Sequence, residues 1–404
     1  MNVLFISPSS PRESVGGIER YIINLIDYSK EQSDINVKIM LPTFSTESVE
    51  NDSNVKMFFN NDLAITPYMS SIQISKKARS FSEQVKKIII DEKIDIICAE
   101  NFHIGFPPAY SILLNMVAVL HKIPLVLRIH SFAVTDLQKE LINQLMWNKI
   151  SCVSLSVAGD CFTKGANVNN LSTEYLGVNT KIFNEKIQKQ SIREDLGFSK
   201  KNKIILTACR ILSGRRIILA EKGIINLIEA FSRIAPRHDE LRLLIAVGRP
   251  PESLSNEFDE ALERLKGYTL LRRVSEKTVI KIFNLDEMPN VYRESDLFVL
   301  ASENETFGQV FIESMACGLP VIGSKVGGIP EIIRDSHSGY LVPPRDSSYL
   351  AQKIEYILSN NSTRDKFIKS ARKSIQDKFT LEAQFSSFMK SLRKIILSEK
   401  DKKP

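Results

Sequence analysis

Cysteine is scarce in this sequence, and the cysteines present show no pattern typical of a disulfide framework or a zinc site. The 404 residues contain five cysteines and a single tryptophan. The cysteines are odd in number and never occur as a C-x-x-C pair. This usage argues against structural disulfides and structural zinc, and it favours a reducing compartment, for which we expect the cytoplasm.

Long uninterrupted hydrophobic runs are missing as well. The most apolar stretch, residues 112–129, is broken by polar and charged residues and by Pro124. We therefore expect no membrane-spanning helix. The first residues lack a basic leader region and reach Pro8 after a few apolar positions, so they predict a first strand rather than a signal peptide.

Several motifs that would indicate other chemistry are absent. No D-x-D tripeptide occurs, so a short carboxylate clamp for Mg²⁺ or Mn²⁺ is missing. No G-x-G-x-x-G follows the first strand, which argues against a nicotinamide enzyme. No helix-turn-helix, zinc-finger or aromatic RNA-binding pattern accompanies the basic residues. We expect no metal, no cofactor and no nucleic-acid partner.

The net charge of +7 is unevenly distributed along the chain. Residues 1–180 contain 16 Lys and Arg against 18 Asp and Glu, whereas residues 181–404 contain 38 against 29. A basic second half is compatible with an anionic small ligand, with an acidic membrane surface, or with solubility alone.

Short apolar runs alternate with amphipathic segments, a pattern typical of parallel α/β sheets covered on both faces. The strand-like runs are residues 3–7, 37–41, 94–99, 125–130 and 151–157, and then 204–209, 243–247, 279–283, 297–301, 321–324 and 340–342. The polar stretch 177–202 separates the two series. We predict a domain over residues 1–180, a second over 181–378, and a helix within 379–404 that packs back on the first domain.

A group of chemistry-bearing residues follows the predicted strand 297–301. A polar loop leads to Gly308, where a helix is predicted to begin, and its exposed amides favour a bound phosphate. Glu305 lies in the loop, and Glu313 lies about 1.5 turns inside the helix, roughly 7–8 Å further along. This spacing suits a ligand with hydroxyls at both ends, such as a sugar and a ribose. Alternatively, one glutamate faces the helix dipole and the other is solvated.

Residues 305–321 resemble the E-x7-E signature of the retaining glycosyltransferases of the GT-B fold, in particular the large family 4 group. Glu305 and Glu313 match its two glutamates. The resemblance continues through residues 326–331 and 338–346, and it includes the Gly-Gly pair after the first strand. It implies two Rossmann-like, doubly wound α/β domains that face each other across a cleft. The second domain would bind the donor, and the first would supply the acceptor site.

The resemblance also implies roles for individual residues. In that family the first glutamate contacts the donor sugar and the second contacts the ribose, which assigns these contacts to Glu305 and Glu313. Backbone groups around Thr306, Phe307 and Gly308 would face the sugar and the diphosphate. The family commonly has a second small residue, often Gly, at the position of Thr306, so this side chain would narrow the sugar pocket.

Family members stabilise the departing diphosphate with an Arg after the first strand of the second domain and a Lys in a following K-G pair. Arg210 and Lys222 match these two positions. Fixed cations can stabilise a leaving diphosphate without a metal ion. The segment between them is longer than usual and contains Arg215 and Arg216, either of which could replace one of the cations.

Two features of the first domain are candidate site elements. Gly16 and Gly17 lie between the first strand and the first helix, where their amides could approach phosphates, although a simple turn is the alternative. His130 closes the strand 125–130 and matches the family's histidine that contacts the donor sugar. His103 follows the strand 94–99 and could line the acceptor side, although a solitary histidine is often structural.

Residues 75–90 predict a helix that is basic on one side and apolar elsewhere. Such a helix is compatible with peripheral contact to the inner face of a membrane, and equally with a simply solvated charged face.

From these observations we expect a retaining, metal-independent glycosyltransferase. Its donor would be a nucleotide-diphosphate sugar, UDP-linked by preference and GDP-linked next, and its acceptor hydroxyl cannot be read from the sequence. Two alternatives are a sugar-nucleotide hydrolase or epimerase of the same fold, and a catalytically silent sugar-nucleotide-binding subunit.

Overall fold

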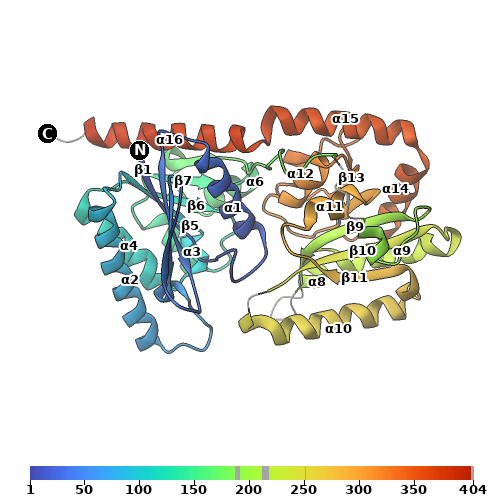
Figure 1. The fold of residues 1–404 in the computed structure, drawn as a ribbon, viewed down its shortest axis with the longest axis horizontal. Coiled ribbons are helices and arrows are strands. Elements are labelled where there is room, and N and C mark those ends of the chain that lie inside the picture. The colour runs from blue at the N-terminus through green and yellow to red at the C-terminus, as the bar shows by residue number, and fades with distance from the viewer. Residues whose placement is uncertain (187–191, 212–217, 251, 402–404) are drawn as a thin grey trace. The chain divides into compact units, whose positions relative to one another are not determined.

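The structure, a computed structural model, describes residues 1–186, 192–211, 218–250 and 252–401. They form two compact units, each built on a mostly or wholly parallel sheet covered by helices (Figure 1). The first unit comprises Met1–Glu13, Ile18–Leu176 and Glu382–Pro404. The second comprises Ser14–Gly17 and Gly177–Leu381.

The sheet of the first unit has eight strands in the order β3-β4-β2-β1-β5-β6-β7-β8. All neighbours are parallel except β3 and β4, which form an antiparallel pair at one edge. The strands are β1 (Asn2–Ile6), β2 (Asn36–Pro42), β3 (Ser48–Asp52), β4 (Val55–Asn60), β5 (Ile96–Glu100), β6 (Leu125–Ile129), β7 (Lys149–Cys152) and β8 (Leu171–Thr173). The helices are α1 (Gly17–Lys30), α2 (Ser71–Asp91), α3 (Phe102–Gly105), α4 (Pro108–His121), α5 (Asp136–Asn143), α6 (Leu155–Thr163) and α16 (Leu381–Asp401).

Aromatic side chains join the helices of the first unit to its sheet. Helix α16 packs beside α1, where Phe385 stacks on Tyr28 with ring centroids 5.1 Å apart, and it reaches β1 through Phe388. Helices α2 and α4 lie side by side, joined by Phe81 and Tyr110 with centroids 5.2 Å apart (Figure 1). The strands between these helices are almost fully buried, which explains their continuous apolar sequences.

The second unit has a six-stranded, wholly parallel sheet in the order β11-β10-β9-β12-β13-β14. Its strands are β9 (Lys203–Arg210), β10 (Leu241–Gly248), β11 (Thr278–Ile282), β12 (Leu297–Leu300), β13 (Val321–Ser324) and β14 (Tyr340–Val342). Its helices are α7 (Ile192–Asp195), α8 (Ile218–Glu221), α9 (Ile224–Ile234), α10 (Ser255–Leu271), α11 (Met288–Arg293), α12 (Gln309–Ala316), α13 (Ile329–Ile332), α14 (Ser347–Ser359) and α15 (Asn361–Lys378).

Both faces of this second sheet are buried. Leu297 and Val299 of β12 belong to a core cluster shared with α9, α10 and α14. Phe298, which points the other way, meets the rings of Tyr292 on α11 and Phe311 on α12 at 5.9 and 5.3 Å. Alternate residues of one strand therefore enter two separate cores, as a doubly wound sheet requires.

Most predicted strands agree with the structure within two residues, but one prediction was wrong at its end. Residues 151–157 were expected to form a single strand, whereas β7 ends at Cys152 and α6 begins at Leu155. The Ser154 hydroxyl caps this helix by accepting a hydrogen bond from the Val157 N–H at 3.1 Å. Strands β3, β4 and β8 were not predicted.

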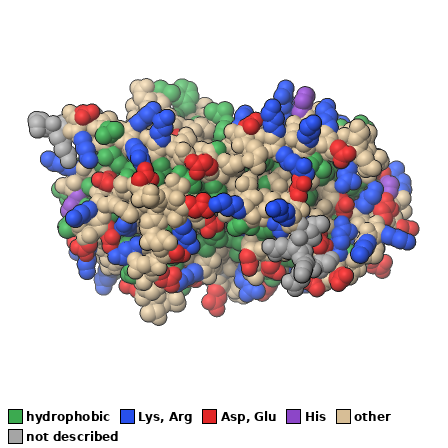
Figure 2. Space-filling view, turned by 45° about the horizontal axis from the view of Figure 1, so that its top comes forward, with side chains coloured by type: hydrophobic (Ala, Val, Ile, Leu, Met, Phe, Trp, Pro, Cys, Tyr) green, Lys and Arg blue, Asp and Glu red, His purple; other side chains and the backbone are tan. Residues whose placement is uncertain are grey.

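The face shown in Figure 2 carries charges of both signs. Its Lys and Arg side chains are interspersed with Asp and Glu. Within the described ranges, no helix combines the length and the apolar content needed to cross a bilayer.

Candidate active site

The strand order of the second unit locates a candidate ligand site. From β9 the chain proceeds outward to β10 and β11 (Figure 1), and it then returns to the other side of β9 to form β12, β13 and β14. The order therefore reverses between β9 and β12, and open α/β sheets bind ligands outside the carboxyl ends of the strands at such a point. Arg210 is the last residue of β9, and the loop 302–308 follows β12.

Glu305 in this loop forms an ion pair with Lys222, which lies just before α9. Lys222 Nζ is 2.9 Å from Glu305 Oε2, and the two side chains are 28% and 13% exposed. Burial disfavours the charged ammonium, but the Glu305 carboxylate outweighs this effect and raises the pKa of Lys222. Two residues separated by 83 positions in the chain are thus brought together at the switch point.

The backbone of the Glu305 loop is held by two glycines that follow β13. Gly327 has a φ of +51°, and an added Cβ would stand 1.7 Å from the carbonyl oxygen of Glu305. The Gly328 N–H donates to the same oxygen at 3.0 Å, and a Cβ there would lie 2.5 Å from the Thr306 carbonyl oxygen. No side chain fits at either position. These glycines belong to the stretch that carried the family resemblance, but their contact with the Glu305 loop was not predicted.

A third glycine brings Lys222 close to β12. Gly223 is the N-cap of α9 and has a φ of +67°, and an added Cβ would stand 1.8 Å from the carbonyl oxygen of Ala301. The K-G pair therefore places the lysine directly against the end of the strand that precedes Glu305.

Gly308 is the N-cap of α12 and adopts the left-handed region, with a φ of +99°. The Phe307 side chain is buried and packs edge-on against Phe379 with ring centroids 6.1 Å apart, while Thr306 is half-buried. The phenyl ring points into the core. This segment therefore presents its backbone, and not the Phe307 side chain, at the edge of the sheet. The predicted helix start at Gly308 agrees with the structure.

Gln309, the first residue of α12, was not identified from the sequence. Its side chain is buried, and neither Oε1 nor Nε2 has a hydrogen-bond partner among the described residues. Buried polar groups are normally satisfied, so both atoms are suited to a polar ligand.

Glu313 lies one turn after Gln309 and is also buried. Its Oε2 accepts a hydrogen bond from the Tyr292 hydroxyl at 3.0 Å, and Tyr292 is fully buried on α11. A carboxylate that receives such a bond is fixed in orientation. Tyr292 is a second residue that the sequence analysis missed, because its contact with Glu313 depends on how α11 packs beside α12.

Arg210 is exposed at the end of β9 and pairs in register with Gly248 of β10. Burial raises the pKa of the neighbouring Cys209 to about 12, with Lys222 opposing and Glu305 adding to the shift. The end of β9 therefore lies within electrostatic range of the Lys222–Glu305 pair. Arg215 and Arg216 lie outside the described residues.

The remaining candidates follow β1, β5 and β6. Gly17 is the first residue of α1 and Gly16 precedes it, and both are grouped with the second unit. His130 follows β6 in the first unit, where its Nε2 lies 2.6 Å from Oε2 of the buried Glu100. Glu100 was not identified from the sequence.

His103 is buried in α3, with Nε2 2.9 Å from the carbonyl oxygen of Ser131. Its Nδ1 is buried without a partner among the residues that the structure describes. Burial lowers the pKa of His103 to about 4.

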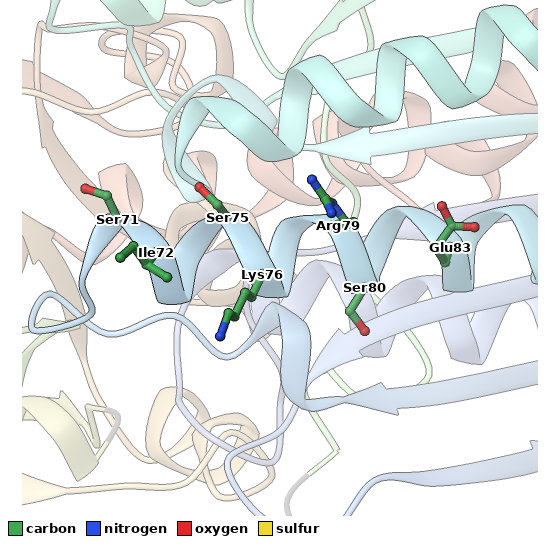
Figure 3. Close-up of a pocket in the computed structure, with 7 residues that line it drawn as sticks. All are labelled: Ser71, Ile72, Ser75, Lys76, Arg79, Ser80 and Glu83. Atoms are coloured by element: carbon green, nitrogen blue, oxygen red, sulfur yellow. The ribbon is translucent and has the colours of Figure 1, made fainter.

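A separate groove of about 580 Å³ follows the N-terminal half of α2 in the first unit. Figure 3 shows its lining residues along this single helix, with Lys76 and Arg79 among three serines. Glu83 also lines the groove, but Lys86 engages its carboxylate at 2.6 Å. In the described part of the chain, no group of three or more His, Cys, Asp or Glu side chains is arranged to hold a metal ion.

Comparison with known proteins identifies relatives of this chain. Residues 188–374 match the family described as Glycosyl transferases group 1. N-acetyl-alpha-D-glucosaminyl L-malate synthase of Bacillus anthracis is 25% identical over 316 residues, covering 76% of this chain and 77% of that protein. Sulfoquinovosyl transferase SQD2 of Arabidopsis thaliana is 25% identical over 390 residues, covering 92% and 69%.

Solved structures share the fold over nearly the whole chain. Sucrose-phosphate synthase from Thermosynechococcus elongatus superimposes with a TM-score of 0.78 at 18% identity, covering 98% of this chain and 99% of that one. Anabaena Alr3699/HepE gives a TM-score of 0.75 at 18% identity, covering 98% and 100%. The expected α/β GT-B fold is confirmed, and the match of residues 188–374 to the group 1 family, together with the named relatives, shows that the chain is a glycosyltransferase.

Proposed function

We propose that the chain transfers a sugar from a nucleotide-diphosphate donor to an acceptor hydroxyl, and that the donor binds at the carboxyl edge of β9 and β12. The observation that carries this proposal is the Lys222–Glu305 pair at the switch point. A cation and a carboxylate 2.9 Å apart offer donors to a phosphate and acceptors to sugar hydroxyls within one ligand's length.

We assign roles to the remaining residues from their contacts within each unit and from the resemblance to the family. Glu313, oriented by Tyr292, accepts from the ribose hydroxyls, and Glu305 accepts from the sugar. The amides around Thr306, Phe307 and Gly308, at the positive end of α12, face the diphosphate. Gly16 and Gly17 add further amides, and His130 contacts the donor sugar.

Lys222 and Arg210 stabilise the charge that develops on the departing diphosphate, which makes transfer metal-independent in this proposal. Lys222 has three N–H donors, so it can keep Glu305 while donating to a phosphate oxygen. Activity unchanged by a chelator is the expected result, and activity restored by Mg²⁺ or Mn²⁺ after chelation contradicts it.

We infer UDP as the nucleotide, with GDP next. Support comes from Anabaena Alr3699/HepE, whose solved structures contain UDP, UDP-glucose, or UDP and glucose. The identity of the donor sugar is less constrained than that of the nucleotide. Thr306 places a side chain at a position where the family often has Gly.

Retention of the anomeric configuration is part of the proposal. Glu305 is engaged by Lys222 rather than poised as a nucleophile beside a paired acid, which favours same-face attack with the leaving phosphate accepting the acceptor's proton. NMR of the first-formed product distinguishes retention from inversion, and an inverted anomer refutes this part.

A thermal-shift panel of UDP, GDP, ADP and CDP sugars tests the donor site directly. A bound donor raises the melting temperature by mass action, and we expect the largest rise with a UDP sugar. The variant Glu305→Gln removes the charge that holds Lys222. Its matched control is Glu303→Gln, because Glu303 lies in the same loop but pairs with Arg345.

We expect Glu305→Gln to lose about a hundredfold in turnover and Glu303→Gln to remain close to wild type. Equal losses of turnover in both variants contradict the assignment of Glu305 to the donor site. Turnover of the sugar nucleotide without acceptor would favour a hydrolase or epimerase, and binding without transfer to any acceptor would favour a silent subunit.

We place the acceptor site in the first unit and infer that this unit contacts an anionic membrane at the inner face. Four apolar side chains on one face of α4 are exposed: Ile112, Met116, Val119 and Leu120. The neighbouring α2 exposes Lys76 and Arg79 in the groove of Figure 3. An apolar stripe beside cations suits a bilayer with acidic headgroups.

Flotation with vesicles tests this contact. We expect binding to phosphatidylcholine vesicles that contain phosphatidylglycerol, none to pure phosphatidylcholine, and loss in the variant K76E/R79E. The control Lys369→Glu reverses one charge on α15 of the second unit and should still bind. Binding that ignores vesicle charge, or no binding, refutes the contact.

A further inference from the structure

Glu100, the last residue of β5, has no solvent exposure, yet it is surrounded by hydrogen-bonding and basic side chains. Its Oε2 lies 2.6 Å from His130 Nε2 and 4.0 Å from Arg128 Nε. Its Oε1 accepts a hydrogen bond from the Tyr21 hydroxyl at 3.2 Å. A buried carboxylate is costly unless such partners replace its hydration, and here those partners include a histidine at the end of a strand.

His130 is held at two points by consecutive residues at the end of the neighbouring strand β5. The Glu100 carboxylate contacts the imidazole ring through Nε2, and the Asn101 side-chain oxygen accepts a hydrogen bond from the backbone N–H of His130 at 2.8 Å. Asn101 has a φ of +52°, which turns the chain at the end of β5. The orientation of the ring is therefore set by β5 and not by His130's own strand.

We propose that Glu100 is a positioning residue that accepts Nε2–H of His130 and so directs an unprotonated Nδ1 toward a hydroxyl of the ligand. The inference rests on the proposed function, in which His130 contacts the donor sugar. It adds a buried carboxylate, and a required tautomer, to that contact.

The chemistry of the ring supports this arrangement. Burial lowers the pKa of His130, with the hydrogen bond to Glu100 opposing it, so the imidazole is neutral near pH 7. A neutral imidazole has one N–H and one acceptor nitrogen. With Nε2–H given to the carboxylate, Nδ1 is the acceptor nitrogen, and the hydrogen bonds of His130 to the described residues use its backbone N–H and its Nε2.

The other charged or titratable groups around the ring reinforce the assignment. The guanidinium of Arg128 is fixed by Ser151 Oγ and the Glu174 carbonyl oxygen, each at 3.3 Å. Its Cζ lies 5.0 Å from the centroid of the Tyr21 ring. The guanidinium therefore places a positive charge beside both Tyr21 and Glu100. His103, on α3, uses its Nε2 for a carbonyl oxygen and competes for neither Glu100 nor His130.

NMR of the full-length, ligand-free protein labelled with ¹⁵N-histidine tests the tautomer, with His130→Gln identifying the signal. At pH 7 we expect a neutral His130 with the proton on Nε2. In Glu100→Gln, which keeps the shape but removes the charge, the pKa of His130 should fall further. A proton on Nδ1 in the wild type, or a pKa unaffected by Glu100→Gln, overturns the proposal.

A kinetic cycle separates positioning from plain structural support. Glu100→Gln should lower kcat by about tenfold to a hundredfold in the wild type and have little further effect in a His130→Gln background. Equal losses in both backgrounds overturn the proposal. If Glu100→Gln does not fold because Arg128 loses its counter-charge, the variant E100Q/R128Q removes both charges and replaces it.

The two measurements also separate this inference from the proposed function. The tautomer is read without donor, so a wrong tautomer overturns the role of Glu100 while binding of nucleotide sugars still stands. The expected tautomer in a protein that binds no nucleotide sugar overturns the proposed function, and with it the role of Glu100.

Discussion

Lys222 Nζ lies 2.9 Å from Glu305 Oε2, so each of these residues supplies the counter-charge of the other at the end of β12. Neither residue can be changed without leaving a partly buried charge beside the proposed donor site. Breaking a shielded pair in this way costs more than breaking one on the surface.

The pair protects the Lys222 amine from reaction. Because Glu305 raises the pKa of Lys222, little neutral amine is present at pH 9. Glu305→Gln should lower this pKa, and Lys222 should then react several-fold faster with acetic anhydride, as quantified by mass spectrometry. Glu303→Gln, on the same loop, should leave the rate unchanged, and equal rates in all three proteins contradict the electrostatic coupling.

Gly327→Ala should destabilise the second unit by about 1–3 kcal/mol, because the added methyl group meets the Glu305 carbonyl oxygen at a positive φ. The effect should appear as a lower melting temperature and weaker UDP binding. The control is Gly267→Ala, which adds a methyl group in open space on α10 and should stabilise by about 1 kcal/mol. A Gly327→Ala variant with unchanged stability and UDP binding would show that the Glu305 loop can move to accommodate the methyl group.

Tyr292→Phe should weaken UDP binding about tenfold with little change in fold, because Glu313 loses the hydrogen bond that orients it. Calorimetry measures the affinity. Tyr268→Phe is the matched control, since the Tyr268 hydroxyl also donates to a glutamate, Glu229, but between α9 and α10. Equal effects of the two substitutions would remove Tyr292 from the site.

Gln309→Met should separate stability from activity. Methionine has a similar length and leaves no buried polar atom without a partner, so the melting temperature should stay equal or rise. Turnover should fall about tenfold if the amide serves the donor. A less stable protein with normal turnover would mean that the amide is needed by the fold instead.

His103 should make the protein sensitive to acid. Burial lowers its pKa from 6.5 to about 4 in the folded state, so the ring is neutral in both states above pH 6.5 and stability is complete there. Between pH 6.5 and 4 protonation favours unfolding, by up to about 3 kcal/mol. In His103→Gln this part of the pH dependence of the melting temperature should vanish, whereas His337→Gln at the surface should retain it.

Several features of the fold were predictable because they depend on neighbours in the chain. Apolar runs bounded by polar residues located strands such as β13 and β14, since a strand buried on both faces has a continuous apolar sequence. The start of α12 at Gly308 followed in the same way. The wrong extension of β7 also had a local signal, because Ser154 is a good helix cap followed by a helical stretch.

The partners of the site residues were not predictable. Glu305 with Lys222, Glu313 with Tyr292 and His130 with Glu100 join residues that lie 21 to 83 positions apart. No local sequence pattern predicts such a contact, because the contact depends on which strands become neighbours and on how helices pack against them. The glycines after β13 illustrate the same point. Only glycine fits at these positions, because a Cβ would meet the carbonyl groups of a loop that is distant in the sequence.

The sequence alone therefore determined the α/β class, the ends of most strands and the presence of two glutamates beside a helix start. Tertiary structure decided which charges neutralise each other, which carboxylate is oriented and which ring nitrogen is left for a ligand. The physical reason is that hydrophobic periodicity is encoded along the chain, whereas desolvation and ion pairing arise only when distant segments exclude water together.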